Sequence, residues 1–192
     1  MNIIFLGPPG AGKGTQGELL ARDLSLPRLS TGAILRRVWR EGGETSKEIG
    51  KYILKGINVP AKLLFKVLEP WFLEHHQGFI ADNFPRSIDQ LEEFKKFLKR
   101  TNLKIDKAFL LEISKEESFK RIDKRFAERK KTGNTRPDER PDIVERKLRE
   151  GYQKDIKPIL DFFNLLGILV VINGEQSIEK VHQDILNNIK LK

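Results

Sequence analysis

Apolar residues recur along this chain in two patterns, which predict alternating strands and helices. Short apolar runs of strand length lie at residues 2–6, 78–81, 108–113 and 168–172, and a short strand near residues 28–30 would make five. These runs lack a regular alternation of apolar and polar residues, which is typical of strands covered on both faces. Segments with apolar residues at helical spacing separate them: 13–24, 31–40, 45–55, 60–74, 88–99, 115–124, 141–164 and 177–190.

This alternation predicts an α/β fold, because crossover helices join neighbouring parallel strands. We expect three layers in a single domain over residues 1–192, with a five-stranded parallel sheet flanked by helices. Two segments are predicted to be small mobile insertions on this core: 30–59, in which Gly42-Gly43 and Gly56 are candidate hinges, and 122–138, which contains a polar turn. Ser114 followed by Glu117 predicts a capping box at a helix start.

Composition narrows the class of protein. With 192 residues, 39% hydrophobic and 33% charged, the chain fits a globular protein. No apolar run is long enough to cross a membrane, and the N-terminus leads directly into a strand, so we expect no signal peptide and no membrane partner. The absence of cysteine excludes a disulfide and a thiolate zinc site. A cytoplasmic location is therefore expected.

The formal net charge of +9 suits either nucleic acid or small polyanionic substrates. A dense basic stretch lies between residues 120 and 131, and its only aromatic residue is Phe126. Base-stacking aromatics that alternate with basic residues are missing from it, so we expect no nucleic-acid partner. Further basic residues follow it at Arg136, Arg140, Arg146, Lys147 and Arg149.

A glycine-rich loop follows the first predicted strand. Residues 7–15 read GPPGAGKGT and lead into a segment with helical spacing. Glycines allow backbone N–H groups to turn around an anion, while the helix N-terminus and Lys13 add positive charge. An ordinary Gly/Pro turn would explain neither the lysine nor the flanking elements. We therefore predict a phosphate-binding loop in which Gly10, Ala11, Gly12, Lys13, Gly14 and Thr15 contact the nucleotide.

A second motif, Asp82-Asn83-Phe84-Pro85-Arg86, follows the strand at 78–81. A carboxylate at the carboxyl end of a parallel strand, beside a phosphate loop, is placed to orient metal-bound water. An arginine four residues later can bind a second phosphate with two parallel hydrogen bonds. The alternative is a strand-ending turn with a surface salt bridge, and the preceding phosphate loop favours the functional interpretation.

These motifs resemble those of adenylate kinases and related nucleoside monophosphate kinases. GxPGxGKGT is their form of the loop, in which Gly14 stands where other phosphate loops have a hydroxyl; DNFPR resembles their DGFPR; TGAILR at 31–36 resembles STGDxLR; and RPDE at 136–139 resembles R-x-D-D. The resemblance covers essentially the whole chain. It implies a P-loop NTPase fold with a short lid, a monomer without structural zinc, and reversible Mg²⁺-dependent phosphoryl transfer from ATP to AMP that gives two ADP.

The resemblance also implies a role for individual residues. Cations of the catalytic centre would be Lys13, Arg86, Arg125, Arg136 and Lys147, although Arg146 and Arg149 remain alternatives to Lys147. ATP would be bound by the phosphate loop, Arg121 and Gln176, and Asp82 would orient the waters of Mg²⁺. The residues implied for AMP are Thr31, Arg36, Ile57, Asn58, Val59, Asn83, Phe84, Pro85, Arg86, Gln90, Arg136 and Lys147.

Departures from the family pattern leave alternatives open. Ala33 stands where relatives have a second aspartate, and Asn83 stands where they have glycine. Gln90 favours AMP, because an amide can both donate to and accept from the edge of adenine; an exposed helical glutamine without function is the alternative. Two other functions stay possible, a kinase for UMP or CMP and a nucleotide-binding module with little catalysis.

Overall fold

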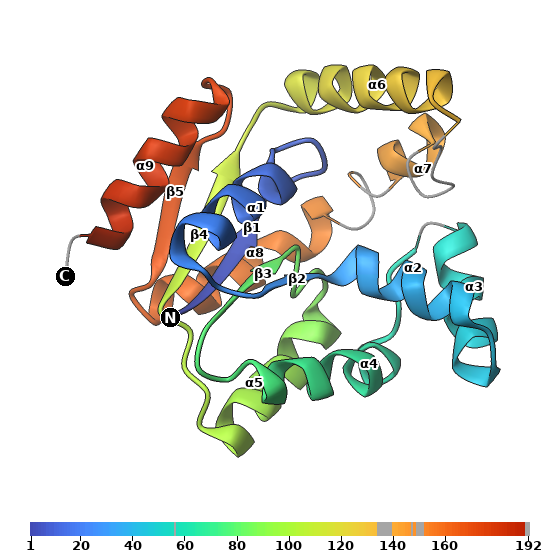
Figure 1. Ribbon diagram of the computed structural model, residues 1–192, viewed down its shortest axis with the longest axis horizontal. Coiled ribbons are helices and arrows are strands. Elements are labelled where there is room, and N and C mark those ends of the chain that lie inside the picture. The colour runs from blue at the N-terminus through green and yellow to red at the C-terminus, as the bar shows by residue number, and fades with distance from the viewer. Residues whose placement is uncertain (56, 134–139, 147, 149–151, 191–192) are drawn as a thin grey trace.

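The computed structural model describes residues 1–55, 57–133, 140–146, 148 and 152–190. Its centre is a five-stranded parallel sheet with the strand order β2-β3-β1-β4-β5 (Figure 1). The strands are β1 (Asn2–Leu6), β2 (Arg28–Ser30), β3 (Phe79–Asp82), β4 (Lys107–Glu112) and β5 (Leu169–Asn173). The five predicted strands and the α/β fold class are therefore confirmed.

Helices cover both faces of this sheet (Figure 1). In the described part of the chain they are α1 (Lys13–Leu24), α2 (Thr31–Glu41), α3 (Glu44–Lys55), α4 (Ala61–Glu74), α5 (Ile88–Thr101), α6 (Lys115–Lys131), α7 (Pro141–Arg146), α8 (Gln153–Leu165) and α9 (Ile178–Lys190). None of these helices combines the length and the apolar character that a membrane span requires.

The two faces of the sheet bury different clusters. Ile3 and Phe5 pack with residues of α1 and α9. Ile4 and Leu6, which point to the opposite face of the same strand, pack with residues of α4, α5 and α8. Because side chains alternate along a strand, both sets must be apolar. This explains why the strand segments read as continuous apolar runs.

Two predicted helices differ from the structure in length. The helix predicted at 115–124 continues to Lys131 as α6. Its last turns contain long charged side chains with good helix propensity, and Arg129, Lys130 and Lys131 stabilise the negative end of the helix dipole. The segment predicted as one helix at 141–164 contains two, α7 and α8. Residues 147 and 149–151, which lie between them, are outside the described residues.

The carboxyl ends of the strands meet at one edge of the sheet, as parallel pairing requires. β1 pairs with β3 so that Phe5 is opposite Asp82, and the loop after β1 therefore starts beside the end of β3. In Figure 1, α6 and α7 lie on one side of this edge, while α2 and α3 extend on the other. Ile122 of α6 packs with Val144 and Leu148 in a small separate cluster.

Candidate active site

The phosphate loop between β1 and α1 has the backbone that its glycines predict. Gly7, Gly10 and Gly12 have φ values of +141°, +82° and +90°. These lie in the region that favours glycine over residues with a Cβ. At Gly7 a Cβ would also lie 2.5 Å from the carbonyl oxygen of Leu111, so a side chain cannot fit there. The loop thus reaches the N-terminus of α1, where backbone N–H groups lack helical partners.

Lys13 is the central cation of this loop. Its Nζ donates to the carbonyl oxygens of Gly7 and Pro8 at 2.9 and 2.8 Å, and only 8% of the residue is exposed. Burial lowers the pKa of Lys13 to about 8; Asp82 opposes this shift, and the positive charges of Arg86 and Arg125 add to it. Three of the predicted site residues therefore lie within electrostatic reach of Lys13.

Asp82 ends β3 beside this lysine. Burial raises the pKa of the Asp82 carboxyl, and the positive charges of Lys13, Arg28 and Arg86 oppose this rise. Its Oδ1 is buried without a hydrogen-bond partner. A buried acceptor without a partner is costly unless water or a ligand meets it. This oxygen therefore fits the predicted task of holding water that is bound to Mg²⁺.

Helix α6 packs directly on the phosphate loop. Ser118 is fully buried, and its Oγ donates to the carbonyl oxygen of Pro9 at 2.6 Å. A Cβ on Gly10 would lie 3.0 Å from the carbonyl oxygen of Ser118 and 3.5 Å from the Cβ of Arg121. This close approach brings α6, and with it Arg125, to the loop that carries Lys13.

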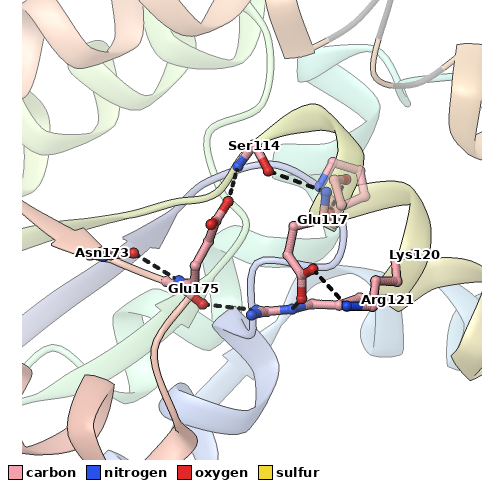
Figure 2. Close-up of polar contacts among 9 residues, drawn as sticks. Ser114, Glu117, Lys120, Arg121, Asn173 and Glu175 are labelled. Atoms are coloured by element: carbon pink, nitrogen blue, oxygen red, sulfur yellow. Dashed lines mark hydrogen bonds and ion pairs between the residues drawn. The ribbon is translucent and has the colours of Figure 1, made fainter.

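Arg121 is fixed between α6 and the turn after β5 (Figure 2). Its Nε donates to Oε1 of Glu117 at 2.7 Å, and its Nη1 donates to the carbonyl oxygen of Gly174 at 2.9 Å. Glu175 joins the same two elements, since its Oε1 accepts the backbone N–H of Ser114 at 2.7 Å. The fold therefore brings Arg121 close to the turn that precedes Gln176, the other residue outside the phosphate loop that is predicted to bind ATP.

The capping box predicted at Ser114 forms only in part. Ser114 Oγ accepts the backbone N–H of Glu117 at 3.2 Å, as predicted. The N–H of Ser114 is bound by Glu175 rather than by Glu117, because Glu117 binds Arg121 instead (Figure 2).

The Gln176 side chain donates to the Asn173 carbonyl and to Asp184, both at 3.0 Å. A contact between Gln176 and the base would then come from its backbone.

Gln90 is the best-defined residue on the acceptor side. Only 2% of it is exposed, so the alternative of an exposed helical glutamine is wrong. Its Oε1 accepts the backbone N–H of Arg86 at 2.9 Å, and its Nε2 donates to the carbonyl oxygen of Val59 at 3.1 Å. Gln90 therefore ties the start of α5 to the segment that precedes α4.

Other residues predicted to bind AMP lie in α2 and in the segment before α4. Thr31 is buried, with its Oγ1 3.5 Å from the carbonyl oxygen of Asp82. Arg36 lies over the start of α2, since a Cβ on Gly32 would be 3.1 Å from its Nη1. Ile57 is exposed, Asn58 is half-buried and Val59 is buried.

The turn after β3 keeps its shape despite the replacement of glycine. Asn83 has φ +65°, in the left-handed region that asparagine tolerates better than most residues. Phe84 is fully buried, with ring centroids 5.0 Å from Phe94 and 5.6 Å from Phe65. Any contact of Phe84 with a nucleotide must come from its backbone, and Pro85 beside it is also buried.

Arg136 and Lys147, both predicted site cations, lie outside the described residues.

Arg28 is a site residue that sequence reasoning missed. Its Nη1 donates to the carbonyl oxygen of Gly14 at 3.3 Å and lies 3.7 Å from Oδ2 of Asp82. The sequence places Arg28 only in a short strand. Its role depends on the parallel pairing of β2 with β3, in which Arg28 is opposite Ile80 and Ser30 is opposite Asp82.

Comparison with known proteins decides between the kinase families that share such a loop. The family model described as "Adenylate kinase" matches residues 5–168. The chain belongs to the adenylate kinase family. The adenylate kinase of Leptospira biflexa serovar Patoc is 34% identical over 189 residues, which cover 97% of this chain and 98% of the relative. The adenylate kinase of Methanosarcina barkeri is 33% identical over 208 residues, with 96% of each chain covered.

Membership of this family confirms the predicted enzyme class, a nucleoside monophosphate kinase that transfers a phosphoryl group. The adenylate kinase of Caldanaerobacter subterraneus is 32% identical over 209 residues, which cover 96% of this chain and 94% of the relative. The match therefore extends across the sheet and the phosphate loop described above. Roles of individual residues remain predictions, because the comparisons concern the whole chain.

Proposed function

We propose that this protein catalyses the reversible transfer of the terminal phosphoryl group from Mg²⁺-bound ATP to AMP, which gives two ADP. The observation that supports this most strongly is the convergence of charges at the sheet edge. Lys13 interacts electrostatically with Asp82, Arg86 and Arg125. These four residues come from three segments of the chain, which are the start of α1, the end of β3 with its following turn, and α6. Phosphoryl transfer needs such a cationic field around two nucleotides more than it needs a covalent intermediate.

Lys13 is suited to bind the phosphates of ATP. Its ammonium donates to two carbonyl oxygens of the loop. A phosphate is a stronger acceptor than a carbonyl, because its hydrogen bonds with a cation are charge-assisted. ATP would therefore draw Nζ towards its phosphates, with Arg86 and Arg125 adding positive charge from the acceptor side and from α6.

Magnesium fits the same place. Bound to ATP, Mg²⁺ would neutralise part of the phosphate charge that develops during transfer. Asp82 is the described residue whose buried Oδ1 is suited to hold its water shell. Ala33 supplies no second carboxylate, so Asp82 would carry this task without it.

The surroundings of Gln90 favour AMP as the acceptor. An amide has two donor hydrogens and an oxygen with two lone pairs. Val59 takes one hydrogen and the Arg86 N–H takes one lone pair. One donor and one acceptor remain, in a fixed orientation, and this pair matches the N6 donor and the ring acceptor of adenine.

We extend the proposal to the two segments beside the site. Residues 30–59 and 122–138 would close over the nucleotides and exclude water, which would suppress hydrolysis of ATP. We further propose that the enzyme acts as a cytoplasmic monomer. Arg136 and one cation at or near Lys147 would complete the charges of the closed site.

A panel of acceptors tests this function directly. ADP formation from ATP and Mg²⁺ would be measured with AMP, CMP, UMP and GMP as acceptors. We expect AMP to give the highest kcat/KM. A preference for pyrimidines would refute the interpretation of Gln90, and ATP binding without ADP formation from any acceptor would favour a nucleotide-binding module.

A further inference from the structure

The side chain of Arg28 reaches from β2 to the first turn of α1. Its Nη1 donates to the carbonyl oxygen of Gly14 at 3.3 Å. A Cβ on Gly17 would lie 3.3 Å from the Arg28 Cδ, and a Cβ on Gly14 would lie 3.9 Å from Nη1. The Arg28 side chain thus packs closely against the first turns of α1, most tightly at Gly17. It is held at the entrance of the phosphate-binding helix rather than in bulk solvent, with 27% of its side chain exposed.

The two oxygens of Asp82 have different surroundings because of this arginine. Oδ2 lies 3.7 Å from the Arg28 Nη1 and close to Gly14, since a Cβ there would be 3.5 Å from it. Oδ1 is buried and has no hydrogen-bond partner. The side chain is only 13% exposed, so solvent screens the ion pair weakly. Arg28 therefore faces one oxygen and leaves the other for a ligand.

The charge balance at this place is unusual for a site that attracts a divalent cation. Asp82 supplies one negative charge, the positive charges of Lys13, Arg28 and Arg86 oppose it, and the residue at 33 is alanine. Of these cations, Arg28 is the one whose Nη1 lies 3.7 Å from Oδ2 of Asp82. A cation that Asp82 holds through a water molecule faces a carboxylate whose negative charge is already largely balanced by these positive charges. The attraction between that carboxylate and the cation is then weaker than with an unpaired aspartate.

We propose that Arg28 is a positioning residue that directs Oδ1 of Asp82 to the water shell of nucleotide-bound magnesium and lowers the affinity of the enzyme–ATP complex for divalent cations. This inference rests on the proposed kinase function. Arg28 then helps to set the concentration of free Mg²⁺ at which half of the enzyme–ATP complex has bound the cation. Nothing in the motifs of the phosphate loop or the DNFPR turn assigns such a role to this residue.

The test measures metal binding without turnover. Free Mn²⁺ would be followed by electron paramagnetic resonance during titration of the enzyme with ATP and no acceptor, with ATP alone as the blank. Three variants would be compared with the wild type: Arg28→Gln, Arg28→Lys, and Arg22→Gln. Arg22 is a well-exposed arginine near the end of α1, so its loss changes the net charge equally but away from Asp82.

We expect Arg28→Gln to bind Mn²⁺ about three- to tenfold more tightly, since one positive charge is removed beside the carboxylate. Arg28→Lys, which keeps the charge, should stay within about twofold of the wild type, and so should Arg22→Gln. An unchanged or weaker affinity in Arg28→Gln would refute the proposal. So would an equal gain in Arg22→Gln, because the effect would then come from net charge.

A double variant shows whether the effect passes through Asp82. In an Asp82→Asn background, Arg28→Gln should change Mn²⁺ affinity much less than in the wild type, as coupling in a double-mutant cycle requires. Equal effects in both backgrounds would contradict the positioning role. If Arg28→Gln does not fold, as judged by the absence of a cooperative unfolding transition, Arg28→Met replaces it. Methionine also removes the positive charge, so the same gain in Mn²⁺ affinity is expected.

The result is separable from the proposed function. If no acceptor gave ADP at saturating Mg²⁺, the kinase proposal would fail, while the Mn²⁺ titrations would still report the effect of Arg28. If ADP forms and the titrations show no effect of Arg28, only the present inference fails. Arg28→Gln should also lower the Mg²⁺ concentration at half-maximal ADP formation by a similar factor.

Discussion

The candidate site has a donor side, formed by the residues predicted to bind ATP, and an acceptor side, formed by the residues predicted to bind AMP. The two sides are attached to the core in different ways. On the donor side, α6 is joined to the phosphate loop by Ser118 and to the turn after β5 by Arg121 and Glu175. On the acceptor side, hydrogen bonds join the start of α5 to its own turn and to the segment before α4, through Gln90 and Asp89. The donor wall, formed by α6 and the turn after β5, is therefore joined to the phosphate loop itself, whereas these acceptor-side bonds join α5 to the segment around Val59.

This difference suits a kinase that must hold one nucleotide and then close over another. A wall fixed by several hydrogen bonds loses little entropy when ATP binds. The predicted insertion at 30–59 would adopt a second arrangement when the acceptor binds. The comparison therefore predicts that substitutions on the two sides affect different kinetic constants.

The largest effect is expected where both sides meet, at Lys13. Lys13→Met removes the cation held by the loop, and we expect kcat/KM to fall by about 10³-fold or more. Steady-state ADP formation measures this. Lys157→Met, which removes an exposed lysine of α8, is the matched control and should leave kcat/KM unchanged. A loss of less than about tenfold in Lys13→Met would remove this lysine from the catalytic centre.

Asp82→Ala is the next test, because this residue lies between the two sides. We expect the Mg²⁺-dependent rate to fall by about 10²-fold, with only a modest loss of nucleotide binding, since the carboxylate acts on the cation rather than on the base. Rates over a range of Mg²⁺ and calorimetric ATP binding would be measured together. Asp161→Asn, at an exposed position of α8, serves as the control. An unchanged rate would exclude Asp82 from the mechanism.

Gln90→Leu tests the acceptor side alone. We expect kcat/KM for AMP to fall by about 30-fold with little change in KM for ATP, because the remaining donor and acceptor of the amide are lost. The free energy of unfolding should fall by about 1–3 kcal/mol, since the Arg86 N–H and Val59 carbonyl lose their partner. Chemical denaturation measures the second effect. Equal losses for AMP and CMP would show that Gln90 does not read the base.

The pH dependence of ATP binding tests the loop cation. Burial lowers the pKa of Lys13 to about 8, and bound phosphates would raise the pKa of this lysine. Binding then takes up a proton as the pH rises above about 8, so ATP affinity should fall about tenfold between pH 7 and pH 9. Calorimetry in two buffers of different ionisation enthalpy measures the proton uptake. The same titration with Lys13→Met should show no comparable slope.

The smallest effect is expected from the donor wall. Glu117→Gln weakens the hold on Arg121, and we expect KM for ATP to rise about threefold while KM for AMP and kcat stay unchanged. Its neighbour Glu116 is exposed on the same turn, so Glu116→Gln is the control. A larger change in KM for AMP than for ATP would contradict the division between the two sides.

The local sequence determined much of this protein. The five strands begin and end within one residue of the predicted positions, because buried strands need continuous apolar runs. The phosphate loop was equally readable, since its positive φ angles, its lysine and its helix start all lie within nine consecutive residues. The position of Asp82 could also be predicted. The carboxyl ends of parallel strands meet at one edge of the sheet, so a residue at the end of a predicted strand lies at that edge.

Tertiary structure alone decided which side chains meet. The pairing of Arg28 with Asp82 needs β2 to lie beside β3, and the hold on Arg121 needs the turn after β5 to reach α6. The burial of Gln90 depends on a backbone carbonyl 31 positions away. Periodicity shows that a residue faces inward, but the partner it finds there depends on strand order and register, and so on contacts distant in the chain.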